Sequence, residues 1–208
     1  MAWASGINLY AALLTLGILA HTGNIVLPEP LQVVADPLVI GAAGFMYLIE
    51  FFADKIPGID SGWDVIQSFV RIPGGAMLAA AAVGDISPAA EIAAGLLGGG
   101  LAATTHATKA GARVMINTSP EPVSNWSASI GEDIAVIGGV WAALHHPWVF
   151  LALLLVFILL MAWLLPRIWR GIKSVAGKIA ALFGRTPQPP ALPPASGGNT
   201  SEPRDHAQ

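Results

Sequence analysis

Four carboxylates lie close together between residues 50 and 64, directly after an apolar segment. Glu50 and Asp54 are four residues apart, and Asp60 and Asp64 repeat this spacing. Side chains four residues apart share one face of a helix. Ionisable groups in or beside a membrane segment are costly unless they are paired, hydrated or bound to an ion, and hard cations prefer several oxygen ligands. The cluster therefore predicts a cation or proton site.

A solvated loop is the alternative interpretation for Asp60 and Asp64, with Lys55 as their charge partner. This alternative suits Glu50 less well, because apolar residues flank Glu50 on both sides. A carboxylate in such a segment costs free energy unless protein contacts compensate it. We therefore expect Glu50 and Asp54 to face the interior of the protein.

A basic face is expected on a second apolar segment. His106, Lys109 and Arg113 follow one another at helical spacing, so they lie on one side of a helix. Two interpretations stay open. In the first, the basic face pairs with Glu50 and Asp54. In the second, it holds an anionic ligand such as a lipid phosphate.

Further polar residues follow the basic face. Pro120 and Pro122 forbid a regular helix through this region, and irregular backbone inside a membrane persists only where protein or a water-filled cavity satisfies it. Glu132 and Asp133 come next. They either join the site or complement the dipole at the start of a helix. The candidate set for ion or substrate binding comprises Glu50, Asp54, Asp60, Asp64, His106, Lys109, Arg113, Asn117, Glu121, Asn125 and Asp133.

The overall composition is that of a membrane protein. Of the 208 residues, 54% are hydrophobic and 11% are charged, whereas soluble domains carry about 25% charged residues. The net charge of −3 provides no basic field for nucleic acid. The chain has no cysteine, which excludes disulfides and thiolate metal sites.

Six apolar segments are predicted to cross the membrane, giving an all-α polytopic domain over residues 1–166. About 20 apolar residues cross a hydrocarbon core of about 30 Å. The third segment is the weakest, because its uninterrupted apolar part, residues 72–84, is short; a re-entrant pair is the alternative there. The six segments are Gly6–Ala20, Pro37–Ala53, Pro73–Ala90, Ile92–Thr108, Ile130–Leu144 and Pro147–Pro166.

The distribution of Lys and Arg predicts that both termini are cytoplasmic. This choice places all ten basic residues on one side of the membrane, and cytoplasmic loops collect Lys and Arg. Residues 167–185 combine apolar positions at helical spacing with basic residues, which predicts an amphipathic interfacial helix. Residues 186–208 contain many Pro, Ser and Gly residues and are predicted to be disordered.

A short internal repeat suggests that two halves, about residues 1–90 and 91–166, are related. Residues 36–41 and 133–138 share the pattern D-x-x-V-I-G, and Pro-Glu-Pro precedes both copies. Each copy is expected to open a span, the second and the fifth. With three spans per half, a duplication would be inverted. Inverted repeats are typical of secondary transporters, whose sites lie between the repeats.

Two of these motifs resemble a bacterial family of small integral membrane proteins, domain of unknown function four-one-two-six. Residues 50–64 match as E-x-x-x-D-K-x-P-x-x-D-x-x-x-D, and residues 109–125 match as K-A-G-x-R-x-x-x-N-x-S-P-E-P-x-S-N. The resemblance covers roughly residues 3–166 and implies the bacterial cytoplasmic (inner) membrane, without an established biochemistry. The first motif is also similar to the Glu-x-Gly-Asp-Lys signature of cation/proton exchangers, although the spacing differs and the Gly is missing.

The leading functional hypothesis is a transporter or channel-like carrier of a cation or of a proton-coupled small solute. The alternative is a lipid-handling membrane enzyme or flippase, in which Asp60 and Asp64 hold Mg²⁺ while Lys109 and Arg113 bind a phosphate head group. A third hypothesis is a scaffold whose charges only pair. The expected partners are membrane lipids and a small ion or solute, without nucleic acid. We expect no cofactor other than a bound cation, and a homo-oligomer is an open option.

Overall fold

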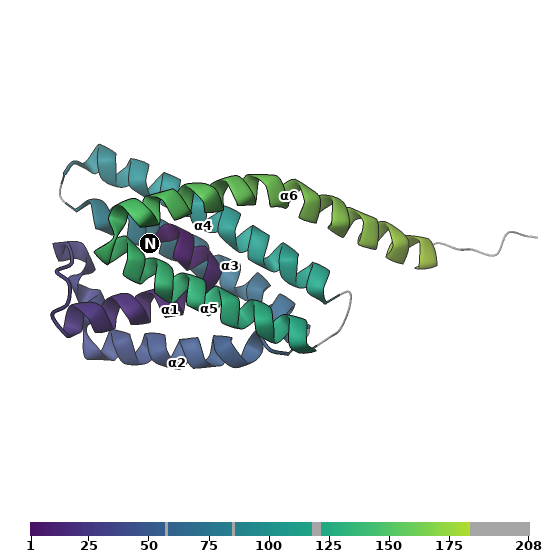
Figure 1. Cartoon of the computed structure of the whole chain (residues 1–208), viewed down its shortest axis with the longest axis horizontal. Helices are drawn as coiled ribbons and strands as arrows, with labels where there is room; N and C mark the ends of the chain where they lie inside the picture. Colours follow the sequence, from purple (N-terminus) through teal and green to yellow (C-terminus); the bar gives the residue numbers. More distant parts are fainter. Residues whose placement is uncertain (57, 85, 118–121, 184–208) are drawn as a thin grey trace, which may run out of the picture.

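The computed structural model describes residues 1–56, 58–84, 86–117 and 122–183, and this part of the chain contains helices and no strands (Figure 1). The prediction of an all-α fold is therefore confirmed. In chain order the elements are α1 (Ala2–His21), the short 3-10 helix η1 (Glu29–Ala35), α2 (Pro37–Ala53), α3 (Ile59–Val83), α4 (Pro88–Ile116), α5 (Pro122–His145) and α6 (Pro147–Phe183).

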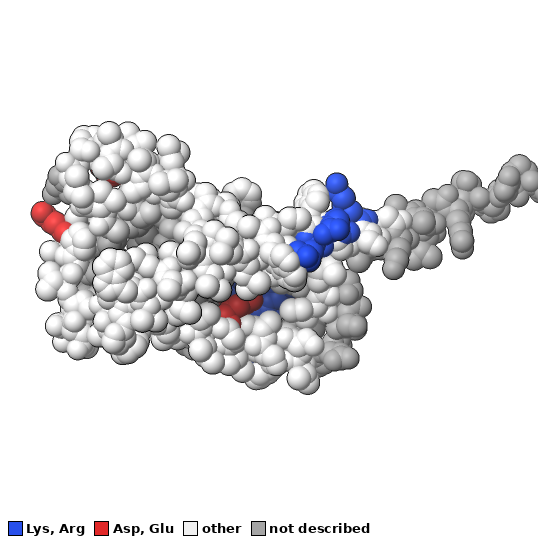
Figure 2. Space-filling model, turned by 45° about the horizontal axis from the view of Figure 1, so that its top comes forward, with Lys and Arg blue, Asp and Glu red and all other residues white. Residues whose placement is uncertain are grey.

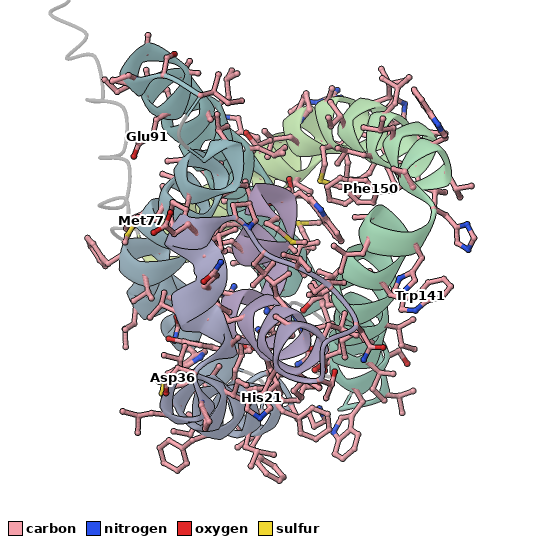
Figure 3. All side chains as sticks on the ribbon, turned by 90° about the vertical axis from the view of Figure 1, so that its left-hand side faces the viewer. His21, Asp36, Met77, Glu91, Trp141 and Phe150 are labelled. Carbon is pink, nitrogen blue, oxygen red and sulfur yellow. The ribbon has the colours of Figure 1, made fainter. Side chains whose placement is uncertain are left out.

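Four of the described helices are long and apolar enough to cross a membrane. They are α1, α3, α5 from Val123 and α6 up to Ser174, and a fifth crossing results if η1 and α2, which meet at 65°, count as one bent span. The predicted count of six is not confirmed, because α4 is not among these helices. Large apolar side chains cover the outside: Figure 3 shows Met77 and Trp141 pointing outward on opposite sides of the bundle.

Proline sets the start of four helices. A proline at the first helical position gives up no hydrogen bond, because that amide has no partner within the helix. Two of these starts are also capped: Asp36 accepts from the Leu38 amide and Ser87 from the Ala90 amide. The four prolines are Pro37, Pro88, Pro122 and Pro147.

Helix α1 is divided at Asn8. The backbone leaves the helical conformation there, with φ −149° and ψ 97°. The amide of Ala11 donates to Asn8 Oδ1 at 2.9 Å, so this side chain caps the second half of the helix. The predicted span Gly6–Ala20 is therefore interrupted rather than continuous.

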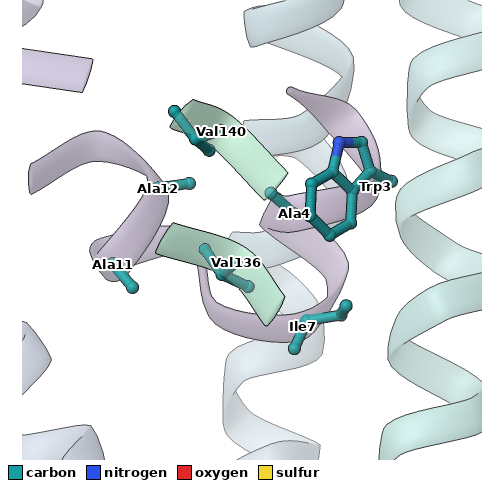
Figure 4. Close-up of a cluster of buried hydrophobic side chains, with 7 residues drawn as sticks. All are labelled: Trp3, Ala4, Ile7, Ala11, Ala12, Val136 and Val140. Atoms are coloured by element: carbon teal, nitrogen blue, oxygen red, sulfur yellow. The ribbon is translucent and has the colours of Figure 1, made fainter. Parts of the chain in front are cut away.

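The two halves of α1 fold back toward each other. Ala4 from the first half and Ala12 from the second belong to one buried cluster with Val136 and Val140 of α5 (Figure 4). An unbroken helix would hold residues 4 and 12 about 12 Å apart. Most of α1 is buried among the other helices, so the break at Asn8 lies inside the bundle.

Helices α3 and α4 form a close antiparallel pair, and both are longer than the sequence predicted. The predicted third span, Pro73–Ala90, is wrong, because the helix begins at Ile59 and ends at Val83. Its charged first half lies outside the predicted span, and a loop was one of two interpretations for Asp60 and Asp64 there. Likewise α4 continues eight residues beyond the predicted end at Thr108, to Ile116, and α5 begins at Pro122 rather than at Ile130.

Helix α6 continues beyond the bundle. Its 37 residues make about 55 Å of helix, whereas the hydrocarbon core is about 30 Å thick. Figure 1 shows its far end projecting away from the other helices. The interfacial helix predicted over residues 167–185 is thus a continuation of α6 through Pro166, as far as Phe183. The predicted disordered tail, residues 186–208, lies outside the described residues.

The two D-x-x-V-I-G motifs lie in different surroundings. Asp36 caps the start of α2 and is exposed. Asp133 lies in the middle of α5 and is buried, because that helix begins eleven residues earlier, at Pro122. The expectation that both motifs open a span is wrong for the second.

Candidate functional site

Helix α3 turns its polar face inward. Asp60, Asp64, Gln67 and Arg71 recur at helical spacing and are all buried, while Phe69 on the other side is exposed. This is the reverse of a helix in a soluble protein, whose apolar stripe faces the core. The arrangement fits a membrane, in which the protein interior is the more polar environment.

Arg71 joins α2 to α3. One guanidinium nitrogen lies 2.7 Å from Glu50 Oε1, and another lies 3.0 Å from Asp64 Oδ1. The side chains of all three residues are fully buried. Arginine suits this place because its planar fork can bind two carboxylates at once and stays charged.

Lys109 of α4 lies at the centre of the carboxylates. Its ammonium is 2.8 Å from Asp54, 3.2 Å from Glu132, 3.5 Å from Glu50 and 3.9 Å from Asp64. The prediction that Glu50 and Asp54 face the interior close to the basic face is therefore confirmed.

The break in α1 provides Lys109 with a further hydrogen-bond acceptor. Its ammonium also donates to the carbonyl of Ile7 at 3.1 Å. That carbonyl is free to accept because the helix stops at the next residue. Asn8 in turn donates to Asp133 at 3.0 Å, and the Tyr47 hydroxyl donates to the other oxygen of Asp133 at 3.1 Å.

Arg113 completes the set of cations one turn further along α4. It lies 2.8 Å from Glu132 and 3.5 Å from Asp54. It also donates to the backbone carbonyls of Asp54 and Asn125 at 3.1 and 3.2 Å. This side chain therefore connects α4 with the ends of α2 and α5.

Asp60 lies apart from these ion pairs and accepts uncharged donors. Asn117 donates to both of its carboxylate oxygens, at 2.9 and 3.0 Å, and Asn125 donates to Asn117 at 3.0 Å. The amides of Gly58 and Ser61 also donate to Asp60. These contacts hold the start of α3 in place.

His106 contacts Ser68 but does not activate it. Its Nε2 lies 2.8 Å from Ser68 Oγ, and its Nδ1 lies 3.3 Å from an Arg71 nitrogen. Because a guanidinium can only donate, Nδ1 must be the acceptor and Nε2 must carry the proton. A base toward serine would need a free Nε2, so this pair lacks the nucleophilic arrangement of a hydrolase.

Lys55, in the link between α2 and α3, has partners other than the predicted loop carboxylates. Its ammonium donates to the Phe51 carbonyl at 2.9 Å and to Ser129 at 3.3 Å, and it lies over the Phe51 ring. Burial lowers the pKa of Lys55, and the charges of Asp133 and Asp54 oppose that shift.

Carboxylates outnumber cations where these contacts meet. We use the term charged centre for the seven linked side chains Glu50, Asp54, Asp64, Glu132, Arg71, Lys109 and Arg113. Four carboxylates face three cations, which leaves one negative charge in surplus when all are ionised. Within the described residues, three buried carboxylate oxygens have no hydrogen-bond partner, one each on Glu50, Asp54 and Asp64.

A family model described as a domain of unknown function, DUF4126, matches residues 1–167. The chain belongs to the DUF4126 family. Comparison with curated proteins and with solved structures gives no match. The DUF4126 region contains the whole charged centre and ends where the basic part of α6 begins.

The structure brings most of the predicted site residues of this DUF4126 protein together. Glu50, Asp54, Asp64, Lys109 and Arg113 belong to the charged centre. His106 and Asn125 are hydrogen-bonded to it, through Arg71 and Arg113 respectively. Asn117 connects Asn125 with Asp60. Asp133 accepts from Asn8, the residue after the Ile7 carbonyl that Lys109 contacts. Glu121 lies outside the described residues.

Sequence reasoning missed Arg71, Glu132 and Asn8. The recurrence of Asp60, Asp64, Gln67 and Arg71 at helical spacing could have identified the first. For Glu132 the sequence left open a place in the site or a complement to a helix dipole, and the candidate set did not include it. A helix that begins at Pro122 places it in the interior of α5 instead.

The burial of the basic residues weakens the topology argument for this DUF4126 protein. Four of the ten Lys and Arg residues, Lys55, Arg71, Lys109 and Arg113, are buried in polar contacts. They report on internal pairing rather than on the side of the membrane. The six others lie at residue 167 and beyond, so sidedness rests on the end of α6 and the residues that follow.

Proposed function

We propose that this protein is a transporter or channel-like carrier that moves a cation, or a small solute coupled to a proton, through the charged centre. The observation that carries the proposal is the surplus carboxylate among seven linked side chains, of which six are buried and Glu132 is partly exposed. An uncompensated charge in a protein interior costs several kcal/mol. The charged centre is therefore expected to bind a proton or a cation. Transport requires that such a species binds reversibly.

The species is proposed to be a proton or a monovalent cation. In the part of the chain that is described, no three His, Asp or Glu side chains come together in a way that could hold a metal ion. A divalent ion prefers six or more oxygen ligands. The unpartnered oxygens of Glu50, Asp54 and Asp64 are suitable acceptors for a single proton.

The divided helix α1 supports a carrier. Discontinuous helices near the bilayer midplane form the sites of many secondary transporters, because their free backbone groups bind ions. Here the carbonyl of Ile7 at the break already accepts from Lys109. A cation arriving at the centre would compete with this ammonium for the same oxygens.

The lipid-handling alternative receives less support. Lys109 and Arg113 each have at least two carboxylates within 4 Å, so a phosphate would meet repulsion there. Asp60 accepts from Asn117, whereas Asp64 pairs with Arg71. The two carboxylates therefore bind different partners and do not converge on one position, as the ligands of a Mg²⁺ ion must. The scaffold alternative is separated from transport by the flux experiment below.

The membrane arrangement is part of the proposal. The protein would cross a bacterial inner membrane six times, with its two halves related as an inverted 3+3 repeat. Both termini would be cytoplasmic, and association into a homo-oligomer is an open option.

The chain contains no cysteine, so single cysteines at Thr22 and Ser174, both exposed, can be labelled in intact cells. An impermeant reagent should modify Thr22→Cys and leave Ser174→Cys unmodified. The reverse pattern would contradict this topology.

Substitution of Glu50 tests transport directly. In Glu50→Gln every cation of the centre keeps a carboxylate partner, since Arg71 retains Asp64 and Lys109 retains Asp54. The fold should therefore persist, while proton- or cation-driven flux in proteoliposomes should fall at least tenfold. The exposed Glu91→Gln is the matched control and should transport like the wild type. Wild-type flux in Glu50→Gln would overturn the proposed role of the charged centre in transport. Absence of flux from the wild type itself would overturn the proposal and favour the scaffold.

A further inference from the structure

A cavity opens toward the charged centre from the side of the bundle, between α4, α5 and α6. Its volume is about 350 Å³. The wall is mostly apolar or small, with Phe157, Met161 and Leu164 contributed by α6 and Ala128 and Gly131 by α5.

Two members of the charged centre, Lys109 and Glu132, line this cavity. Glu132 is the most accessible of the paired carboxylates, with 20% of its side chain exposed, while Lys109 is 2% exposed. Figure 2 shows acidic and basic atoms together at the bottom of a hollow in an otherwise uncharged part of the surface.

The surroundings of the cavity are those of a lipid-facing surface. Exposed apolar side chains continue along both flanking helices, with Ile130 and Ile134 on α5 and Leu160 and Trp163 on α6. A molecule in the apolar part of the membrane could thus reach the centre without passing through either aqueous end of the bundle.

The charge of the centre decides which kind of molecule fits. An anion would have to approach Lys109 through the four carboxylates that lie within 4 Å of it. A cation would instead be attracted by the surplus negative charge and could approach the exposed part of Glu132. The aromatic face of Phe157 and the thioether of Met161 are favourable neighbours for an organic cation with an apolar part.

We propose that this lateral cavity binds a small amphiphilic organic cation that enters from the lipid, with its ammonium group against Glu132 and its apolar group between α5 and α6. The inference rests on the proposed function and names the substrate class of the same site. A proton and the organic cation would compete for the surplus carboxylate charge, which is the basis for exchanging one for the other.

Binding of benzyltrimethylammonium to the full chain in lipid nanodiscs is the test. Equilibrium dialysis should give saturable binding that weakens as the proton concentration rises. Neopentylbenzene, a neutral molecule of the same shape, and benzenesulfonate, an anion, should each bind at least tenfold more weakly. Glu132→Gln should weaken binding of the cation at least tenfold.

A pair of glycines on α5 provides a control for the location. A side-chain carbon at Gly131 or at Gly138 would meet no atom within 4 Å, so both positions accept a larger residue. Gly131 lines the lateral cavity, whereas Gly138 lines a separate one. Gly131→Leu should reduce binding of benzyltrimethylammonium at least tenfold, and Gly138→Leu should leave it within twofold of the wild type.

The outcomes separate the inference from the proposed function. Equal binding of the cation and its neutral analogue, or preference for the anion, would overturn the inference. The same holds if Gly131→Leu binds like Gly138→Leu. If the probe fails to bind while Glu50-dependent flux of protons or inorganic cations persists, the inference is wrong and the proposed function stands. If the wild type neither binds the probe nor shows that flux, both the inference and the proposed function are wrong.

Discussion

Replacing Arg71 with methionine is expected to destabilise the protein by about 3–5 kcal/mol. That is the range for removing one member of a buried ion pair, because the partner charge is left without compensation. Arg71 is fully buried and contacts Glu50 and Asp64 at 2.7 and 3.0 Å. Its loss would raise the surplus of the charged centre from one negative charge to two.

The measurement for this variant is the free energy of unfolding in detergent micelles, by denaturant titration followed by circular dichroism. Arg167→Met is the matched control. Arg167 is exposed on α6, so its replacement should change the free energy of unfolding by no more than about 0.5 kcal/mol. An Arg71→Met variant as stable as Arg167→Met would show that the ion pairs do not hold α2 against α3.

The second large effect is expected for Gly98→Leu, where α3 and α4 pack closely against each other. Any side chain at Gly98 would meet the Ala79 side chain, and the backbone carbonyl of Gly75 would lie only 2.9 Å from its first carbon. A backbone atom cannot move aside as a side chain can, so the helices must separate. Overpacking of this kind typically costs about 1–3 kcal/mol, occasionally more. We expect the upper end of that range, because the separation would also pull Lys109 away from Asp64.

Gly100→Leu, two residues along the same helix, is the control for this effect. Its added side chain would meet no atom within 4 Å. The unfolding free energies of the two variants should therefore differ by about 2 kcal/mol or more, with Gly100→Leu close to the wild type. Equal stabilities would mean that the α3–α4 contact tolerates separation.

The sequence predicted the parts of the fold that depend on hydropathy and helical spacing. The all-α class and the DUF4126 family are confirmed, and so is the burial of Glu50 and Asp54 against Lys109. The burial of Glu50 and Asp54 followed from the free-energy cost of an ionised carboxylate inside a membrane, which is high unless a partner compensates the charge.

The start of α3 could not be located in the same way. A hydropathy argument excludes charged residues from a span, so the third span was predicted to begin only at Pro73, after Asp60, Asp64 and Arg71. In the structure these charges pair with one another and with neighbouring helices, which removes the cost that the argument assumed. Hydropathy cannot anticipate compensation by residues distant in the sequence.

The break at Asn8 left almost no signal in the sequence. Uncharged, mostly apolar residues surround it, and no proline or glycine pair marks an interruption. The interruption is stabilised from elsewhere, by Asp133 of α5 and by Lys109 of α4, which contacts the carbonyl before it. A span that is broken by its tertiary partners can be recognised only once those partners are in place.

The central claim of this account is that the charged centre binds one exchangeable proton or cation. Infrared difference spectroscopy in nanodiscs tests it most directly, because a protonated carboxylic acid and a carboxylate absorb at different frequencies. Without Na⁺ and K⁺, one protonated carboxylic acid should be detected, and it should vanish in Glu50→Gln, where three carboxylates face three cations. Added permeant cation should also remove it from the wild type. A spectrum without this acid, unchanged by cations or by the substitution, would contradict the account.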